Sequence, residues 1–180
     1  MFERFTKSAR HVVLNAVSEA ENDRAERVTA EHLMLSLLRA PAVTASLLAD
    51  SGVLPEDVRD EFAQARRRAG LTQSEVDALS GLGIDLPSIV SRIEATHGPD
   101  ALAAPKRRRP HLPGSHIPFA DEAKNILTNA LVQAKENRDR HISDHHFLLA
   151  MAAAPGVPAQ ILAEHGLTYT AVLRHFAKAG

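Results

Sequence analysis

Residues 28–41 read VTAEHLMLSLLRAP, and residues 142–155 read ISDHHFLLAMAAAP. These stretches are two copies of one pattern at an offset of 114 residues, and the alignment extends without a gap over residues 5–65 and 119–179. Of the 61 aligned pairs, 19 are identical. A repeat of this length indicates that one structural unit occurs twice, so it bears on the whole fold.

Capping and breaking residues divide each copy into four helices. In the first copy, Thr6 and Thr29 are candidate N-caps of the first and second helices. The second helix is apolar nearly all round and therefore predicted to be buried, and Pro41 ends it. Gly52 closes a short third helix, and Pro55 lies in the first turn of the fourth. The second copy repeats this punctuation at Ser143, Pro155 and Gly166.

The pattern predicts an all-α fold, a pseudo-two-fold tandem repeat of a four-helix unit with an extra helical insertion between the copies. Residues 79–93 resemble the second half of the unit at an offset of 31, which predicts a helical hairpin there. We expect repeat one over residues 1–65, the insertion and a Pro-rich, basic linker over 66–115, and repeat two over 116–180. Both repeats would form one compact domain.

The composition narrows the class of protein. Hydrophobic residues make up 44% of the 180 residues and aromatic residues only 4%, which suits close-packed helices. The net charge of −1 gives no global attraction to nucleic acid or anionic lipid. The chain has no cysteine, no signal-peptide pattern at its start and no apolar run of about 20 residues. We therefore expect a cytoplasmic protein that has no membrane partner.

Sequence motifs for catalysis are absent. The chain has no G-x-x-x-x-G-K-[ST], G-x-G-x-x-G or G-x-S-x-G motif and no cysteine nucleophile, so we expect neither an enzyme nor a bound cofactor. The basic run at residues 106–109 lies between prolines without aromatic residues. Such a run is more typical of a solvated linker than of a nucleic-acid site, so nucleic acid is not an expected partner.

Three histidines near residue 143 raise the question of a metal site. His141 and His145 are four residues apart, but Ser143 is the predicted N-cap, so His141 lies before the helix and the two do not share a helical face. His146 aligns with His32 of the first copy, which indicates an architectural histidine in the core. The sequence therefore predicts no metal site.

Three stretches resemble the N-terminal domain of the Clp-family AAA+ unfoldases, especially the ClpC type: MFERFT at 1–6, AEHLML at 30–35 and GSHIPF at 114–119. The resemblance covers both copies, about two-thirds of the chain. It implies an all-helical tandem repeat that docks substrates and adaptor proteins. The long middle insertion departs from the ClpC pattern. Together with a chain that stops after the second copy, it favours a stand-alone protein over an excised fragment.

The resemblance also implies a site for phosphoarginine. Glu31 would accept the guanidinium group, and Thr6, near a helix N-terminus, would bind the phosphate. In copy two the same positions hold His145 and Ala120, so we expect only copy one to bind this mark. The alternative is that Glu31 and Thr6 only stabilise helix starts.

A second implied surface binds cyclic peptide antibiotics at a seam between the first helices of the two copies. The matching residues are Phe2, Glu3, His116, Phe119 and Lys124. Aromatic anchors with a polar rim are typical of peptide sites. The alternative for Phe119 is a place in the core, because it aligns with Phe5.

These observations predict a non-enzymatic protein- or peptide-binding module that acts as an adaptor or substrate receptor in proteolysis by a Clp unfoldase. The expected partners are the Clp unfoldase or its substrates and adaptors. A sharper version is a decoy for cyclic peptide antibiotics. The alternative is the N-terminal fragment of an ATP-dependent ClpC-type unfoldase.

Overall fold

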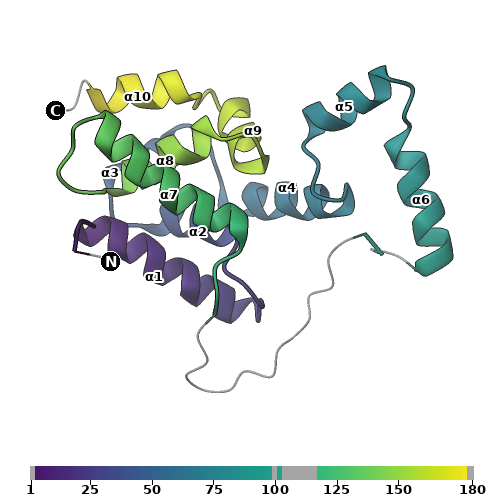
Figure 1. Cartoon of the computed structure of the whole chain (residues 1–180), viewed down its shortest axis with the longest axis horizontal. Coiled ribbons are helices and arrows are strands. Elements are labelled where there is room, and N and C mark those ends of the chain that lie inside the picture. The colour runs from purple at the N-terminus through teal and green to yellow at the C-terminus, as the bar shows by residue number, and fades with distance from the viewer. Residues whose placement is uncertain (1–2, 99–100, 103–116, 178–180) are drawn as a thin grey trace.

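The computed structural model describes residues 3–98, 101–102 and 117–177. Within these residues the chain forms ten α-helices and no β-strand (Figure 1). In chain order the helices are α1 (Lys7–Asn22), α2 (Ala30–Arg39), α3 (Val43–Asp50), α4 (Pro55–Arg67), α5 (Gln73–Gly81), α6 (Leu86–His97), α7 (Asp121–Glu136), α8 (Asp144–Ala153), α9 (Val157–Glu164) and α10 (Tyr169–Ala177).

The helices repeat with the sequence. The first and last residues of α7, α8 and α9 lie 114 positions after those of α1, α2 and α3. The start of α10 at Tyr169 likewise lies 114 positions after the start of α4 at Pro55. The predicted all-α tandem repeat of a four-helix unit is therefore confirmed, and α1–α4 and α7–α10 are its two copies.

Two short backbone bridges join the copies. Phe5 pairs with Ile142, and Val28 pairs with Phe119, both in parallel orientation. Since Phe5 aligns with Phe119 and Val28 with Ile142, the two bridges join equivalent positions of the two repeats. Each joins the chain before the first helix of one repeat to the chain before the second helix of the other, as pseudo-two-fold symmetry requires.

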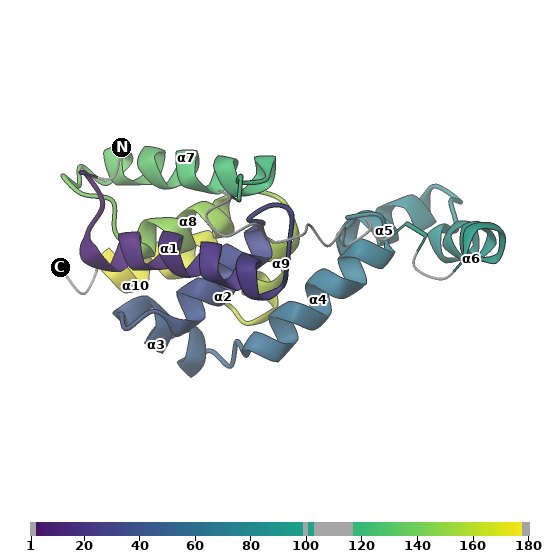
Figure 2. The same ribbon diagram turned by 90° about the horizontal axis from the view of Figure 1, so that it is seen from below.

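The core is centred on α2 and α8, which lie inside the bundle (Figure 2). Leu33, Leu35 and Leu37 of α2 are fully buried, as are Phe147 and Leu149 of α8. Burial of such side chains on all faces of a helix contributes about 1.5–3 kcal/mol each. The prediction that the second helix of each unit is buried is thus confirmed.

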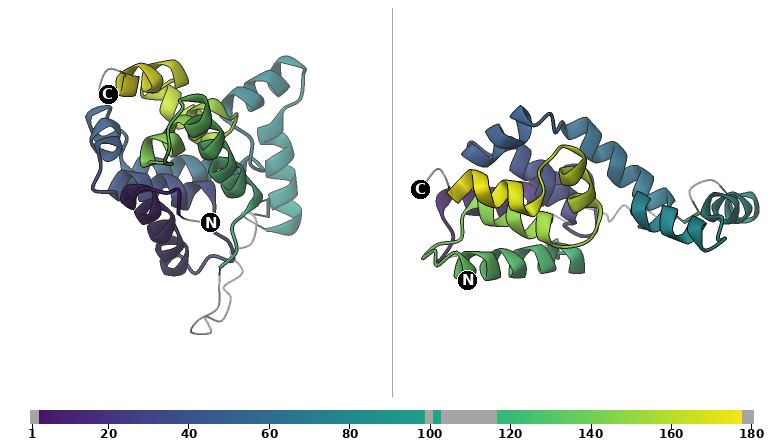
Figure 3. Two further views of the ribbon diagram at one scale, coloured as in Figure 1. Left: turned by 60° about the vertical axis from the view of Figure 1, so that its left-hand side comes forward. Right: turned by 90° about the horizontal axis from the view of Figure 1, so that it is seen from above.

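The predicted extra hairpin is also present, as α5 and α6. In Figure 2 and the right-hand view of Figure 3 this hairpin projects from the other helices at the end of α4. Thr72 caps α5 through a hydrogen bond from the Glu75 amide, and Asp85 caps α6 through one from the Ser88 amide. Local capping therefore explains why both helices begin where they do.

No single helix in the described ranges has both the length and the apolar content to cross a bilayer. Two helix pairs reach that apolar content jointly, α2 with α3 and α8 with α9, but each pair is bent by more than 90°.

Candidate functional site

Thr6 lies at the N-terminus of α1 and caps it. Its side-chain oxygen accepts a hydrogen bond from the Ala9 amide at 3.2 Å, and its own amide donates to the Ile142 carbonyl at 2.9 Å. The adjacent Ser8 hydroxyl donates to Asp144 of α8 at 2.7 Å. The start of α1 therefore lies against the start of α8, in the other repeat.

Glu31, the second predicted phosphoarginine residue, lies in the first turn of α2, which follows the far end of α1. Because α1 has 16 residues, its two ends are about 24 Å apart. Thr6 and Glu31 therefore do not form one site, and the predicted pairing within copy one is corrected.

The reciprocal bridges explain this separation. The Ala120 amide donates to the Val28 carbonyl at 2.8 Å, so the start of α2 lies beside the start of α7. Glu31 is thus close to Ala120, the position where copy two lacks the threonine. Thr6 in turn is close to the start of α8, where His145 replaces the glutamate. Glu31 and Thr6, the two residues that fit a phosphoarginine site, therefore each lie next to a position where the other repeat has lost its matching residue. A complete site would take its glutamate from one repeat and its threonine from the other.

Glu31 is 8% exposed and forms an ion pair with Arg66 of α4, with 2.6 Å between Nη1 and Oε2. The two side chains form part of one wall of a groove of about 710 Å³ where the two repeats meet. We call it the α2–α7 groove. Its lining residues are Thr29, Ala30, Glu31, Phe62, Ala65, Arg66, Gly70, Glu122, Asn125, Ile126, Thr128, Asn129, Met151, Ala154, Pro155, Gly156, Val157 and Pro158.

The groove combines an apolar interior with polar groups at its edge. Ile126 and Met151 are buried, and Phe62 is half-buried. Glu122 and Asn125 lie on exposed positions of α7. An apolar cleft with a few convergent polar groups is the usual form of a small-ligand or peptide site. The arrangement can hold an apolar side chain and present a carboxylate and a guanidinium to a polar group beside it.

Sequence reasoning missed Arg66 as a site residue. The signal for it is the run of arginines at 66–68, at the end of the fourth helix. Basic residues there are expected from the helix dipole alone, so the run does not show which of them turns toward α2.

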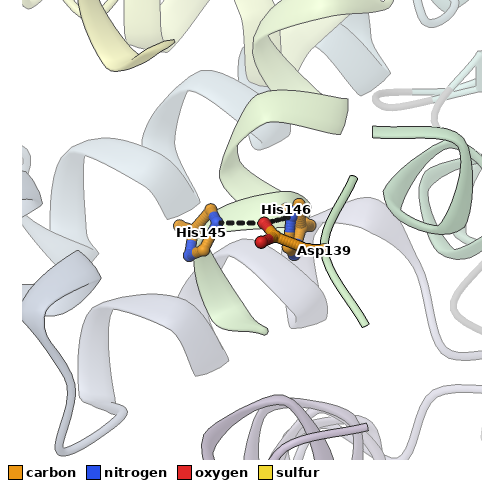
Figure 4. A group of neighbouring side chains, drawn as sticks. All are labelled: Asp139, His145 and His146. Carbon is orange, nitrogen blue, oxygen red and sulfur yellow. Dashed lines mark hydrogen bonds and ion pairs between the residues drawn. The ribbon is translucent and has the colours of Figure 1, made fainter. Parts of the chain in front are cut away.

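Asp139, His145 and His146 form the one group of potential metal ligands among the described residues, with ligand atoms within 4.8 Å of one another (Figure 4). The Ser143 amide donates to Nδ1 of His146 at 3.0 Å, so the neutral ring carries its proton on Nε2. That Nε2 lies 2.9 Å from Asp139 and donates to it.

A metal ion bound to Nε2 of His146 would require the ring proton to move to Nδ1. There it would face the amide proton of Ser143, which Nδ1 now accepts. The group therefore fits a structural hydrogen-bond network better than a metal site. Burial lowers the pKa of His145 and of His146, and the neighbouring Asp139 opposes this shift without reversing it. His32 repeats the arrangement in the first copy: the Thr29 amide donates to its Nδ1 at 2.9 Å.

Among the described residues of the predicted peptide seam, Glu3, Phe119 and Lys124 do not line the groove. Phe2 and His116 lie outside the described residues, as does the basic run at 106–109. Glu3 is exposed in the turn before α1, and Lys124 is exposed on α7, with Nζ 3.0 Å from Asp121. Phe119 is half-buried against the core, which is closer to the alternative role of a core residue than to that of an exposed peptide anchor.

The chain is similar to a known protein family and to several solved structures. Residues 4–69 match the family model described as the Clp repeat (R) N-terminal domain. Similar solved structures include one from preliminary structural investigations of a malarial protein secretion system, with a TM-score of 0.62 and 11% identity over 98% of this chain and 94% of that chain.

Two further structures are N-terminal domains of larger proteins. That of the caseinolytic protease associated chaperone ClpD from Arabidopsis thaliana has a TM-score of 0.55 and 16% identity over 98% of this chain and 97% of that chain. That of Hsp104 from Candida albicans has a TM-score of 0.55 and 17% identity over 94% and 87%. At such identities the structures show the shared fold, and the family model matches the first repeat. This chain therefore contains a Clp-N-like domain.

Proposed function

We propose that this chain is a non-catalytic protein- or peptide-binding module that acts in proteolysis by a Clp unfoldase, as an adaptor or a substrate receptor. The observation that supports this most directly is the α2–α7 groove, with its apolar interior and the Glu31–Arg66 ion pair on its wall. The Clp-N-like fold supports it too, because a protein described as a chaperone has a similar N-terminal domain.

The groove favours a ligand that has both an apolar part and a phosphorylated guanidinium group. Glu31 would accept N–H groups of the ligand guanidinium, since a carboxylate and a guanidinium form strong paired hydrogen bonds. Arg66 would leave Glu31 and bind the phosphate, close to the positive N-terminal end of α2. Phosphoarginine therefore remains the proposed ligand group, and Arg66 takes the phosphate-binding role that we predicted for Thr6.

Calorimetric titration of free phosphoarginine into the whole chain tests this proposal. We expect one weak site. Glu31→Gln and Arg66→Gln should each weaken binding by about tenfold or more, because each removes a charge-assisted hydrogen bond. Arg92→Gln on α6 is the matched control and should leave the affinity unchanged. Thr6→Ala should also leave it unchanged, since Thr6 lies at the far end of α1.

The experiments test phosphoarginine as the ligand and the general docking role separately. Two equal sites, or a loss on Thr6→Ala equal to that on Glu31→Gln, would contradict the proposed site. No binding at all would reject phosphoarginine as the ligand. The general role is tested separately by co-purification from a native extract, where Clp unfoldase subunits should be retained by the unmutated chain and less by Glu31→Gln. Equal retention by both proteins would reject the groove as the docking site.

We also propose the decoy role as a narrower function, supported by the exposed Glu3 and Lys124 near the helices that the seam would use. Phe2→Ala should weaken binding of a cyclic peptide by more than about 1 kcal/mol, the cost of losing a modest anchor. Fluorescence polarisation with a labelled cyclic peptide measures this. An unmutated chain that shows no binding at micromolar peptide would reject the decoy role.

A further inference from the structure

The α5–α6 hairpin is a third copy of the α3–α4 half of the repeat unit. At an offset of 31 residues, the last residue of α3 matches that of α5, and the first residue of α4 matches that of α6. The glycines between the helices, Gly52 and Gly83, have φ of 79° and 81°, and Gly166 of the second repeat has 73°.

The hydrogen bonds of the three turns agree as well. The residue after the glycine donates its amide to a carbonyl five positions earlier: Val53 to Leu48 at 3.0 Å, Ile84 to Leu79 at 2.9 Å, and Leu167 to Leu162 at 2.8 Å. These three hairpins therefore have one backbone design and point equivalent side chains to the same face.

That face is buried in the two repeats and exposed in the third hairpin. Val53 and Val58 of the first repeat are 1% and 0% exposed. Their counterparts Ile84 and Ile89 are 41% and 42% exposed, and Leu82 in the turn is 78% exposed. The reason is that α2 covers the α3–α4 hairpin, whereas no equivalent helix covers α5 and α6 in the described chain. No residue of α6 is buried.

An uncovered hairpin of this size needs a partner. Helices of 9 and 12 residues are marginal in water without packing, since isolated helices below about 12–15 residues are barely stable. On α6 the apolar stripe consists of Leu86, Ile89, Val90 and Ile93, at the i, i+3, i+4, i+7 spacing of a packing face. The stripe contains no charged residue, so covering it would not require an unpaired charge to be buried.

We propose that this face pairs with the same face of a second copy of the chain about a two-fold axis, forming a four-helix bundle from two hairpins. Half-units of this kind already lie side by side inside the molecule, where α2 covers the equivalent face: α4 packs on α9, and the Ser51 carbonyl lies 3.1 Å from Nδ1 of His165, in the corresponding turn. The third half-unit has no such mate within the described chain, and a second copy supplies an identical one, as an isologous interface requires.

The size of the face sets the expected strength. Two helices of about 10 Å width, about 14 Å and about 18 Å long, cover a footprint of roughly 320 Å² per copy. This is well below the roughly 800 Å² per partner that is usual for stable complexes. The dimer should therefore be weak and depend on concentration.

Because the chain contains no cysteine, single-cysteine variants test the pairing directly. Ile89→Cys lies on the proposed face, and Ser91→Cys is its matched control on the opposite side of α6, about 200° around the helix. Under mild oxidation, Ile89→Cys should form a covalent dimer several-fold faster than Ser91→Cys. Sedimentation equilibrium of the unmutated chain should show a monomer–dimer equilibrium, which Ile89→Glu shifts to monomer and Ser91→Glu does not.

Circular dichroism distinguishes a lost interface from a lost fold, because Ile89→Glu should keep the helical content of the two repeats. Equal cross-linking rates of the two cysteine variants would overturn the proposal. A chain that stays monomeric up to about 500 µM would also overturn it and would leave the face to a different protein. The test does not involve the α2–α7 groove, so its result is independent of the proposed function.

Discussion

At Asp144, a carboxylate of one repeat accepts hydrogen bonds from hydroxyl groups of the other. The residue is 8% exposed, and its oxygens accept from Ser8 of α1 and from Thr44 of α3. Both donors are polar groups in the interface between the repeats, and Asp144 is the acceptor that they share. Asp144 also begins α8, where a negative charge is favoured by the helix dipole.

We therefore expect Asp144→Ala to lower the free energy of unfolding by about 1–3 kcal/mol, because it leaves the two hydroxyls without this acceptor. Asp121→Ala is the control: it also removes an acid from the first residue of a helix, but its side chain is 82% exposed. Its cost should stay within about 0.5 kcal/mol. Urea denaturation of both variants measures the difference, and equal costs would mean that Asp144 acts through the helix dipole alone.

At the scale of the element, α2 and α8 share an unusual N-terminal cap. In each, the residue at the third helical position is a histidine whose ring nitrogen accepts the amide proton of the N-cap residue. Glutamate or glutamine holds this position in the common capping box. Burial lowers the pKa of both His32 and His146, so the rings stay neutral and keep Nδ1 free to accept.

The lowered pKa values predict that acid destabilises the fold. In the unfolded chain these histidines gain protons as the pH falls through about 6.5, whereas in the folded chain they resist protonation. The unfolded state then binds more protons, so stability is complete above about pH 6.5 and is lost as the pH falls toward the lowered folded values.

The double variant His32→Gln, His146→Gln keeps an acceptor at the cap without a titrating ring. Its unfolding free energy should change less between about pH 7.5 and about pH 5.5 than that of the unmutated chain. His11→Gln on the exposed side of α1 is the control and should retain the full pH dependence. Denaturant titration at both pH values measures this, and an unchanged slope in the double variant would show that other groups control acid stability.

At the scale of the whole molecule, the reciprocal bridges determine what the repeats can do together. Because each N-terminal segment docks on the second helix of the other repeat, every site at these starts draws residues from both halves. The α2–α7 groove is such a site, with walls from α2 and α4 of one repeat and from α7, α8 and α9 of the other. A change that loosens the contact between repeats should therefore affect the groove before it affects either half.

The helices and the duplication could be predicted from the amino-acid sequence alone, because both depend on local signals. N-caps, prolines and C-terminal glycines act within one turn, which is why α7–α9 have bounds 114 residues after α1–α3 and why the extra hairpin could be predicted. Burial of the second helix followed from its apolar character, and an architectural His146 followed from its match to His32.

Which helix ends meet depends on how the whole chain packs. No local signal shows that the start of α1 lies against α8 rather than α2, so sequence alignment within one copy placed Thr6 and Glu31 together when they lie at opposite ends of α1. The same holds for the Glu31–Arg66 ion pair and for the uncovered face of α5 and α6. These features come from the docking of segments far apart in the chain, where burial and packing geometry, not helix propensity, select the contact.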